Sequence, residues 1–367
     1  MNSEKVSEKK NKEKKNKEKK TTYAGQSFSF IMAAVVLMFV LLVATVVIFT
    51  LMMRLSNSID AINDIDYNQH YVFIADDRDQ ALWKAVYESA KEEAVTQNIY
   101  LEDLSDTLGV NYSTEDLLRI AVNSSVDGII YGGASSDGVV ELINRAVDEG
   151  IGVTILQKDM DYSARQCFVG ANNYELGRIY GSQIVAATGS SVLPVTEVEL
   201  LIDGDISEGA LNILIMGIEE YVQEHDTRYG REINITTTRI YSGDAFSVDE
   251  LIRGMFLERS ELPEVIICLN SMYTKSVYQA VVDYNKVGET AIIGYYADEA
   301  TLDAIVKKIL FSTISIDTHE MGVLAIGALD EFHEHGYTSS FVSVDIDVYD
   351  YDNATKALSD MEVAGDD

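Results

Sequence analysis

Cysteine and histidine, the residues that most often bind metals or react, are sparse in this sequence. Cys167 and Cys268 lie in the apolar runs QCFVG and VIICLN. A disulfide between them is one interpretation for an exported domain, but two buried thiols fit these strand-like runs better. The five histidines show no metal-ligand spacing, and His333 and His335 in EFHEHG would lie on different sides of a helix. We therefore expect neither a metal site nor a cofactor.

Motifs for nucleophilic, phosphate-binding or zinc-dependent catalysis are also absent. The sequence contains no Gly-x-Ser-x-Gly, no Gly-x-x-x-x-Gly-Lys-Ser/Thr and no HExxH. The glycine-rich segment YGGASSDG (131–138) lacks GxGxxG spacing and follows the third predicted strand rather than the first. With 60 Asp and Glu residues, close carboxylate pairs will occur by chance and are no evidence of glycosidase chemistry. An extracytoplasmic enzyme is the disfavoured alternative, and we predict a non-enzymatic protein.

An uncharged apolar run occupies residues 28–53. It exceeds the roughly 20 residues that a helix needs to cross a bilayer, so we expect a transmembrane helix. Residues 1–20 hold nine Lys and four Glu, a net charge of 9 − 4 = +5, which predicts a cytoplasmic N-terminus and an extracytoplasmic remainder. A cleavable signal peptide is the alternative, but its apolar core is usually shorter and ends in a small-x-small site. We expect an uncleaved signal anchor in a bacterial cell membrane.

The overall charge limits the choice of partners. The chain carries 28 Lys and Arg against 60 Asp and Glu, a formal net charge of −32. Such an acidic surface repels nucleic acid, so we expect no DNA or RNA partner.

After residue 70, short Val- and Ile-rich runs alternate with amphipathic stretches of helix length. Strand–helix alternation of this kind predicts parallel sheets built from βαβ units, and eleven strands exceed one typical sheet. Two doubly wound lobes are the natural division, each starting with a strand and an acidic loop, IADDRD and LIDGDI. The predicted strands cover residues 71–75, 99–104, 127–132, 152–157, 167–170, 198–202, 233–241, 264–270, 291–296, 310–316 and 341–348.

Four longer segments carry a resemblance to a known family. They are FVGANNYELGRIYGSQI (168–184), AIIGYYADEATLDAIVKK (291–308), STISIDTHEMGVLAIGAL (312–329) and VSVDIDVYDYDNA (342–354). Their order and spacing resemble the type I periplasmic sugar-binding family, the ribose- and galactose-binding group that shares its fold with the LacI-type repressor core. The resemblance implies an α/β fold of two Rossmann-like lobes, three hinge crossings and closure on a ligand between the lobes.

The resemblance also implies domain boundaries. Hinge crossings are expected near Asn172, Asp317 and Phe341. The expected parts are a cytoplasmic tail 1–27, a membrane anchor 28–53, a stalk 54–70, a binding domain 71–355 with lobe 1 at 71–172 and 317–340 and lobe 2 at 173–316 and 341–355, and an acidic tail 356–367.

Two aromatic side chains match family positions that cover the C–H face of a sugar ring. Trp83, the only tryptophan, follows the first strand in DQALWKAV, with Gln80 at a neighbouring polar position. Phe246, in SGDAFSVDE, matches an aromatic position of the second lobe. If both positions carry over, two rings from opposite lobes clamp the ligand. The alternative for Trp83 is that it only packs its helix onto the sheet.

Polar candidates lie at the ends of four further strands. Gln157 and Lys158 stand where the family usually has Asp–Arg, and both can donate hydrogen bonds to sugar hydroxyls. Asn270 matches the first residue of a family Asn–Asp pair, although Asn also favours the turn at a strand end. Tyr296 occupies the place of a family Asp, and Asp317 either has a polar role or marks the hinge.

Departures from the family pattern concern charged groups. The family's Arg in the helix after the sixth strand is replaced near Leu214, and the carboxylate at the position of Tyr296 is missing. The resemblance therefore implies a more aromatic and less charged pocket, and it does not transfer the ligand's identity.

Taken together, these observations predict a membrane-anchored receptor for a solute, expected to be a carbohydrate, that serves an ABC permease. The alternative is a sensing subunit that reports to a membrane histidine kinase. A LacI-type repressor shares the fold but does not fit the apolar run, the missing helix-turn-helix or the acidic charge.

Overall fold

The computed structural model describes residues 38, 42–47, 67–76, 81–108, 112–160, 162–189, 193–225, 232–241, 245–259 and 261–364. The chain divides into two compact units, Met1–Asp66 and Tyr67–Asp367. In the first unit, residues 42–47 are helical and exposed. The anchor predicted at 28–53 lies mostly outside the described residues, as do the cytoplasmic tail and most of the stalk. No helix in the described part of the chain is long and apolar enough to span a membrane.

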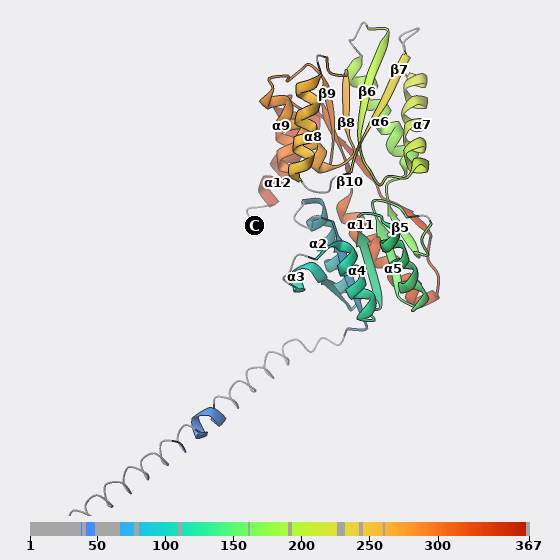
Figure 1. Ribbon diagram of the computed structural model, residues 1–367, viewed down its shortest axis with the longest axis vertical. Helices are drawn as coiled ribbons and strands as arrows, with labels where there is room; N and C mark the ends of the chain where they lie inside the picture. Colours follow the sequence, from blue (N-terminus) through green and yellow to red (C-terminus); the bar gives the residue numbers. More distant parts are fainter. Residues whose placement is uncertain are drawn as a thin grey trace, which may run out of the picture. The chain divides into compact units, whose positions relative to one another are not determined.

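The second unit contains two six-stranded sheets, each at the centre of one lobe (Figure 1). In lobe 1 the strand order is β11-β5-β4-β3-β1-β2 and all pairings are parallel. Its strands are β1 (Gln69–Ala75), β2 (Ile99–Asp103), β3 (Gly128–Gly132), β4 (Gly152–Leu156), β5 (Cys167–Gly170) and β11 (Phe341–Ser343). Its helices are α2 (Ala81–Thr96), α3 (Leu104–Leu108), α4 (Thr114–Asn123), α5 (Asp137–Asp148) and α11 (Thr318–His335).

Lobe 2 repeats this arrangement with the order β12-β10-β9-β8-β6-β7, in which only β12 is antiparallel to its neighbour. Its strands are β6 (Val195–Asp203), β7 (Glu232–Ile240), β8 (Val265–Cys268), β9 (Ala291–Tyr295), β10 (Ser312–Ile316) and β12 (Ile346–Tyr349). Its helices are α6 (Asn173–Thr188), α7 (Glu208–His225), α8 (Ala245–Glu258), α9 (Ser271–Asp283), α10 (Glu299–Val306) and α12 (Tyr351–Ala364). The predicted two-lobed α/β fold is confirmed.

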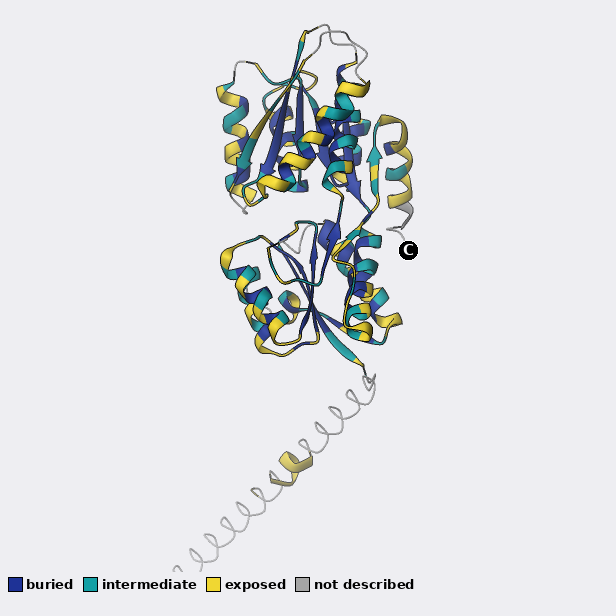
Figure 2. Ribbon diagram, turned by 90° about the vertical axis from the view of Figure 1, so that its right-hand side faces the viewer, coloured by how far each residue is buried: buried dark blue, intermediate teal, exposed yellow. Residues whose placement is uncertain are grey.

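Helices cover both faces of each sheet, which is why the central strands are apolar throughout (Figure 2). In lobe 1, α2 and α11 pack on one face, and α4 and α5 pack on the other. In lobe 2, α6 and α7 lie opposite α8, α9, α10 and α12. Cys167 and Cys268 are buried free thiols in separate lobes, as the apolar runs around them predict.

The chain passes between the lobes three times. Asn172 and Asp317 lie at the first two passages and cap α6 and α11 with their side chains. The third passage differs from the prediction at Phe341, because the strand β11 that begins there still pairs with β5 of lobe 1. The chain enters lobe 2 only at β12, so the single strand predicted at 341–348 is split between two sheets.

The passages are joined to one another by backbone hydrogen bonds. The Val344 amide donates to the Gly170 carbonyl at 3.2 Å, and the Asp317 amide donates to the Asp345 carbonyl at 3.0 Å. Asp317 therefore belongs to the hinge.

The C-terminal segment also differs from its prediction. Instead of an acidic tail from residue 356, α12 extends to Ala364 and packs on lobe 2 through Ala354, Ala357 and Leu358. The segment was predicted to be a tail because it is rich in acidic residues. Its few apolar side chains recur at helical spacing and form the packed face of the helix.

Candidate functional site

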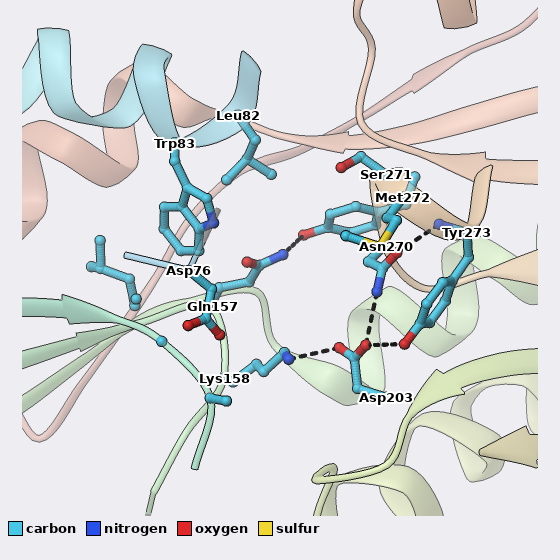
Figure 3. A pocket seen from close by; sticks show the side chains of 15 residues that line it. Asp76, Leu82, Trp83, Gln157, Lys158, Asp203, Asn270, Ser271, Met272 and Tyr273 are labelled. Atoms are coloured by element: carbon cyan, nitrogen blue, oxygen red, sulfur yellow. Dashed lines mark hydrogen bonds and ion pairs between the residues drawn. The ribbon is translucent and has the colours of Figure 1, made fainter. Parts of the chain in front are cut away.

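A cavity of about 300 Å³ lies between the carboxyl ends of the strands of the two lobes (Figure 3). Ligands of open α/β sheets bind at this edge. Lobe 1 contributes Asp76, Leu82, Trp83, Gly132, Gly133, Ala134, Leu156, Gln157 and Lys158, and lobe 2 contributes Asp203, Asn270, Ser271, Met272, Tyr273 and Tyr295.

Trp83 forms an aromatic wall of the cavity. Its helix α2 starts after the loop that follows β1, which places the ring at the sheet edge. The ring packs against Gly132 so closely that a Cβ there would collide with it, and it meets Phe73 edge-on at 6.4 Å between centroids. Trp83 therefore packs onto the sheet and lines the cavity at the same time, so the two interpretations of this residue are compatible.

Gln157 spans the cavity from the end of β4. Its Nε2 donates to the Tyr295 hydroxyl of lobe 2 at 3.0 Å. Gln157 has a φ of 64°, a left-handed backbone conformation that is costly for a residue other than glycine. Such conformations concentrate at binding sites, where the surrounding structure holds them in place.

Lys158 and Asp203 form an ion pair across the cavity, with 2.8 Å between Nζ and Oδ2. The other oxygen of Asp203 accepts from the Tyr273 hydroxyl at 2.6 Å and from the Asn270 amide at 2.8 Å. Burial alone would lower the pKa of Lys158, but Asp203 and then Asp205 outweigh it, and the net pKa lies above its usual value. Lys158 therefore stays protonated between the two lobes.

A further polar contact lies beside this pair. The Ser135 amide of lobe 1 donates to Asp205 at 3.1 Å, and Lys158 Nζ lies 3.5 Å from the other Asp205 oxygen. Together with the Gln157–Tyr295 bond, these contacts connect the lobes through side chains that line or border the cavity.

The model of a family described as "Periplasmic binding protein domain" matches residues 71–334, which are most of the chain. The chain belongs to the periplasmic binding protein family. Members of this family bind solutes without catalysing a reaction, in agreement with the prediction of a non-enzymatic protein. No curated protein matches the sequence.

Solved structures of periplasmic binding proteins share the fold. GanP, a glucose-galactose binding protein from Geobacillus stearothermophilus, is 20% identical over 78% of this chain and 98% of its own, with a TM-score of 0.65. A sugar ABC transporter sugar-binding protein from Bacillus halodurans is 18% identical over 78% and 99%, with a TM-score of 0.62. The XylFII-LytSN complex matches at 19% identity over 77% and 98%, with a TM-score of 0.61. At these identities the likeness concerns the fold alone.

Half of the predicted contact residues line the cavity of this periplasmic binding protein: Trp83, Gln157, Lys158 and Asn270. The Asn270 side chain also has structural partners, because its oxygen caps α9 and its nitrogen donates to Asp203. The cap interpretation of Asn270 is therefore confirmed. Contact with a ligand, for which one amide hydrogen remains, stays a prediction.

Three other predicted contacts, Phe246, Tyr296 and Asp317, do not line the cavity. The fourth, Gln80, lies outside the described residues. Phe246, on the first turn of α8, is 77% exposed, so it does not form a clamp with Trp83 in this structure. Tyr295 and Tyr296 both pack into the apolar cluster under α2 and α11, but of the two only Tyr295 also lines the cavity. Asp317 is the cap at the hinge.

Five further polar residues line the cavity and were not among the predicted contacts: Asp76, Asp203, Ser271, Tyr273 and Tyr295. The two aspartates were visible in the acidic loops IADDRD and LIDGDI, which served only to mark the start of each lobe. Tyr273 gave no signal, because its role depends on how α9 presents it to Asp203. Asp76, Lys158 and Asp203 place charged groups in the wall of the cavity, and Trp83, Tyr273 and Tyr295 place aromatic rings there. That the pocket is less charged than the family pattern stays a prediction.

Proposed function

We propose that this periplasmic binding protein is an extracytoplasmic carbohydrate receptor that closes on its ligand and delivers it to an ABC permease. One observation carries the proposal. An indole ring, Trp83, lines the same cavity as carboxylate, amide, ammonium and phenol groups from the facing edges of two lobes. A ring and hydrogen-bonding groups are what a pyranose needs for its C–H face and its hydroxyls.

Trp83→Ala is expected to weaken sugar binding by tenfold or more, about 1.4 kcal/mol, because the sugar loses its aromatic surface. A thermal-shift screen of the full chain with mono- and oligosaccharides would identify a ligand, and calorimetry would then compare the variant with wild type. Since Trp83 is only 6% exposed and supports α2, Trp83→Phe serves as a second variant that keeps an aromatic ring.

Two results would contradict this prediction. The carbohydrate assignment fails if nucleosides or amino acids raise the unfolding midpoint and no sugar does. If the folded Trp83→Ala variant binds sugar as tightly as wild type, the ring serves only to pack α2 onto the sheet. Phe246→Ala tests the two-ring clamp separately, since only a rearrangement of the lobes on binding would make this exposed side chain matter.

Sensing is the second candidate function. A solved structure of this fold is a complex of XylFII with LytSN, so the fold can form a complex with another protein. The membrane anchor proposed at residues 28–53 would place a receptor beside a membrane-bound histidine kinase. In this role the receptor would pass its signal to that second protein through contact outside the membrane.

Replacing residues 1–53 with a lipoprotein signal in the bacterial host distinguishes uptake from sensing. We expect sugar uptake to survive, because a permease needs only the folded lobes near the membrane. Uptake would be measured with radiolabelled sugar, and induction of the sugar-responsive genes would be measured in parallel. Normal uptake in a strain that lacks the whole protein would contradict the transport role, and lost induction with the lipid anchor would favour sensing.

A further inference from the structure

Among the described residues, acidic side chains outnumber basic ones around the cavity. This imbalance indicates which class of carbohydrate the site would bind, and the inference rests on the proposed function. Three carboxylates, Asp76, Asp203 and Asp205, line or border the cavity, and Lys158 is the cation that lines it among the described residues. The ammonium is held by two of these carboxylates. Among the described residues, carboxylates therefore outnumber cations at the cavity before any ligand enters.

Lys158 and Asp203 are occupied with each other and with their neighbours. Asp203 accepts three hydrogen bonds from protein groups, and Lys158 Nζ lies between Asp203 and Asp205. An acidic ligand group would have to displace Asp203 from Lys158 and would then lie beside the displaced carboxylate. Repulsion between like charges at such short range is unfavourable, and it is strongest where water is excluded.

Asp76 differs from the other carboxylates of the cavity. It follows β1 directly, is partly buried, and forms no ion pair with a Lys or Arg of the described residues. Burial is the main cause that raises the pKa of Asp76. The charge of Lys158 opposes the rise, as do hydrogen bonds from the Thr114 side chain and the Ala134 backbone, so the carboxylate has neutral partners but no ion-pair partner among the described residues. A partly buried carboxylate of this kind gains most from a cationic group that enters the cavity with the ligand.

We propose that Asp76 binds the protonated amine of an amino sugar, and that the excess negative charge excludes sugar acids and sugar phosphates. The chain's formal net charge of −32 acts in the same direction, because it raises the local concentration of cations and lowers that of anions.

Binding of matched sugars to the full chain tests this proposal. The probes are glucose, glucosamine and glucuronate, and galactose, galactosamine and galacturonate, measured by calorimetry at low and high salt. We expect the amine to bind about tenfold more tightly than the neutral sugar of its series, and the acid to show no binding. Asp76→Asn should bring the ratio of amine to neutral affinity close to one. Added salt should reduce the same ratio in the wild type.

Asp148→Asn is the matched control, because it removes one carboxylate from an exposed position at the end of α5, away from the cavity, and should leave the ratio unchanged. If neutral sugars bind and amines bind no more tightly, or if Asp76→Asn keeps the preference, the amine assignment is wrong and the carbohydrate receptor stands. Tight binding of an acid would also overturn it. If none of the six sugars nor any other carbohydrate binds, the proposed function fails first and this inference fails with it.

Discussion

Asp203→Ala is expected to lower the free energy of unfolding by about 2–4 kcal/mol. The carboxylate accepts hydrogen bonds from Tyr273 and Asn270 and pairs with Lys158, so its removal leaves three donors without their acceptor. Tyr273 is only 2% exposed, so its hydroxyl loses its protein acceptor in a largely buried position. Urea unfolding of the full chain, followed by far-UV circular dichroism, would measure the change.

Asp205→Ala is the comparison for this prediction. Asp205 accepts from the Ser135 amide and lies 3.5 Å from Lys158, but it has no buried tyrosine to satisfy. We expect Asp205→Ala to lower the free energy of unfolding by less than half as much as Asp203→Ala. Equal losses would show that net charge at the cleft, rather than the hydrogen bonds of Asp203, stabilises the site.

The second large change in stability is expected at two glycines of α11. Replacing each with alanine should change the free energy of unfolding in opposite directions. Gly322 faces α2 at the crossing of the two helices. A Cβ at Gly322 would collide with the Ser89 hydroxyl and lie 2.5 Å from the Val86 carbonyl oxygen. Because backbone atoms cannot give way locally, Gly322→Ala must push the helices apart, at a cost of about 3 kcal/mol.

Gly327, on the same helix, is exposed, and a Cβ there would meet nothing within 4 Å. Gly327→Ala should therefore stabilise the chain by about 0.5–1 kcal/mol, since alanine loses less backbone entropy in a helix. Thermal and urea unfolding of both variants would measure whether each change raises or lowers the free energy of unfolding. Two changes of the same sign would mean that helix propensity alone, and not the contact with α2, decides the outcome.

Much of the fold could be predicted from the sequence because the buried strands are apolar along their whole length. Every predicted strand overlaps an observed one, and most boundaries agree within a few residues. One error lies at the C-terminus, where α12 replaces the predicted tail, and the other lies where the chain changes lobes. Residues 341–348 read as one strand, because alternation along a segment does not reveal that its two halves pair with different sheets.

The site was less predictable than the fold for a physical reason. Gln157 and Lys158 could be placed because they directly follow a strand, and strand ends converge at one edge. Tyr295 and Tyr296 are adjacent, and only the local backbone, with a φ of 70° at Tyr296, decides which ring faces the cavity. A sequence pattern can identify the end of a strand, but it does not predict which of two adjacent side chains faces the cavity.

Lobe 1 is built from two segments that lie far apart in the sequence. This separation determines the order in which the lobes can fold during synthesis and export. The strands β1 to β5 come first, but α11, which covers α2 and one face of their sheet, is more than two hundred residues away in the sequence from α2. Until α11 arrives, the apolar surface that receives Met321, Ala325 and Leu329 has no cover. Most of lobe 2 lies between these segments in one stretch, so it can fold before lobe 1 is complete. The part of the chain made first therefore finishes folding late, and during that interval it is the part most exposed to aggregation and to proteases.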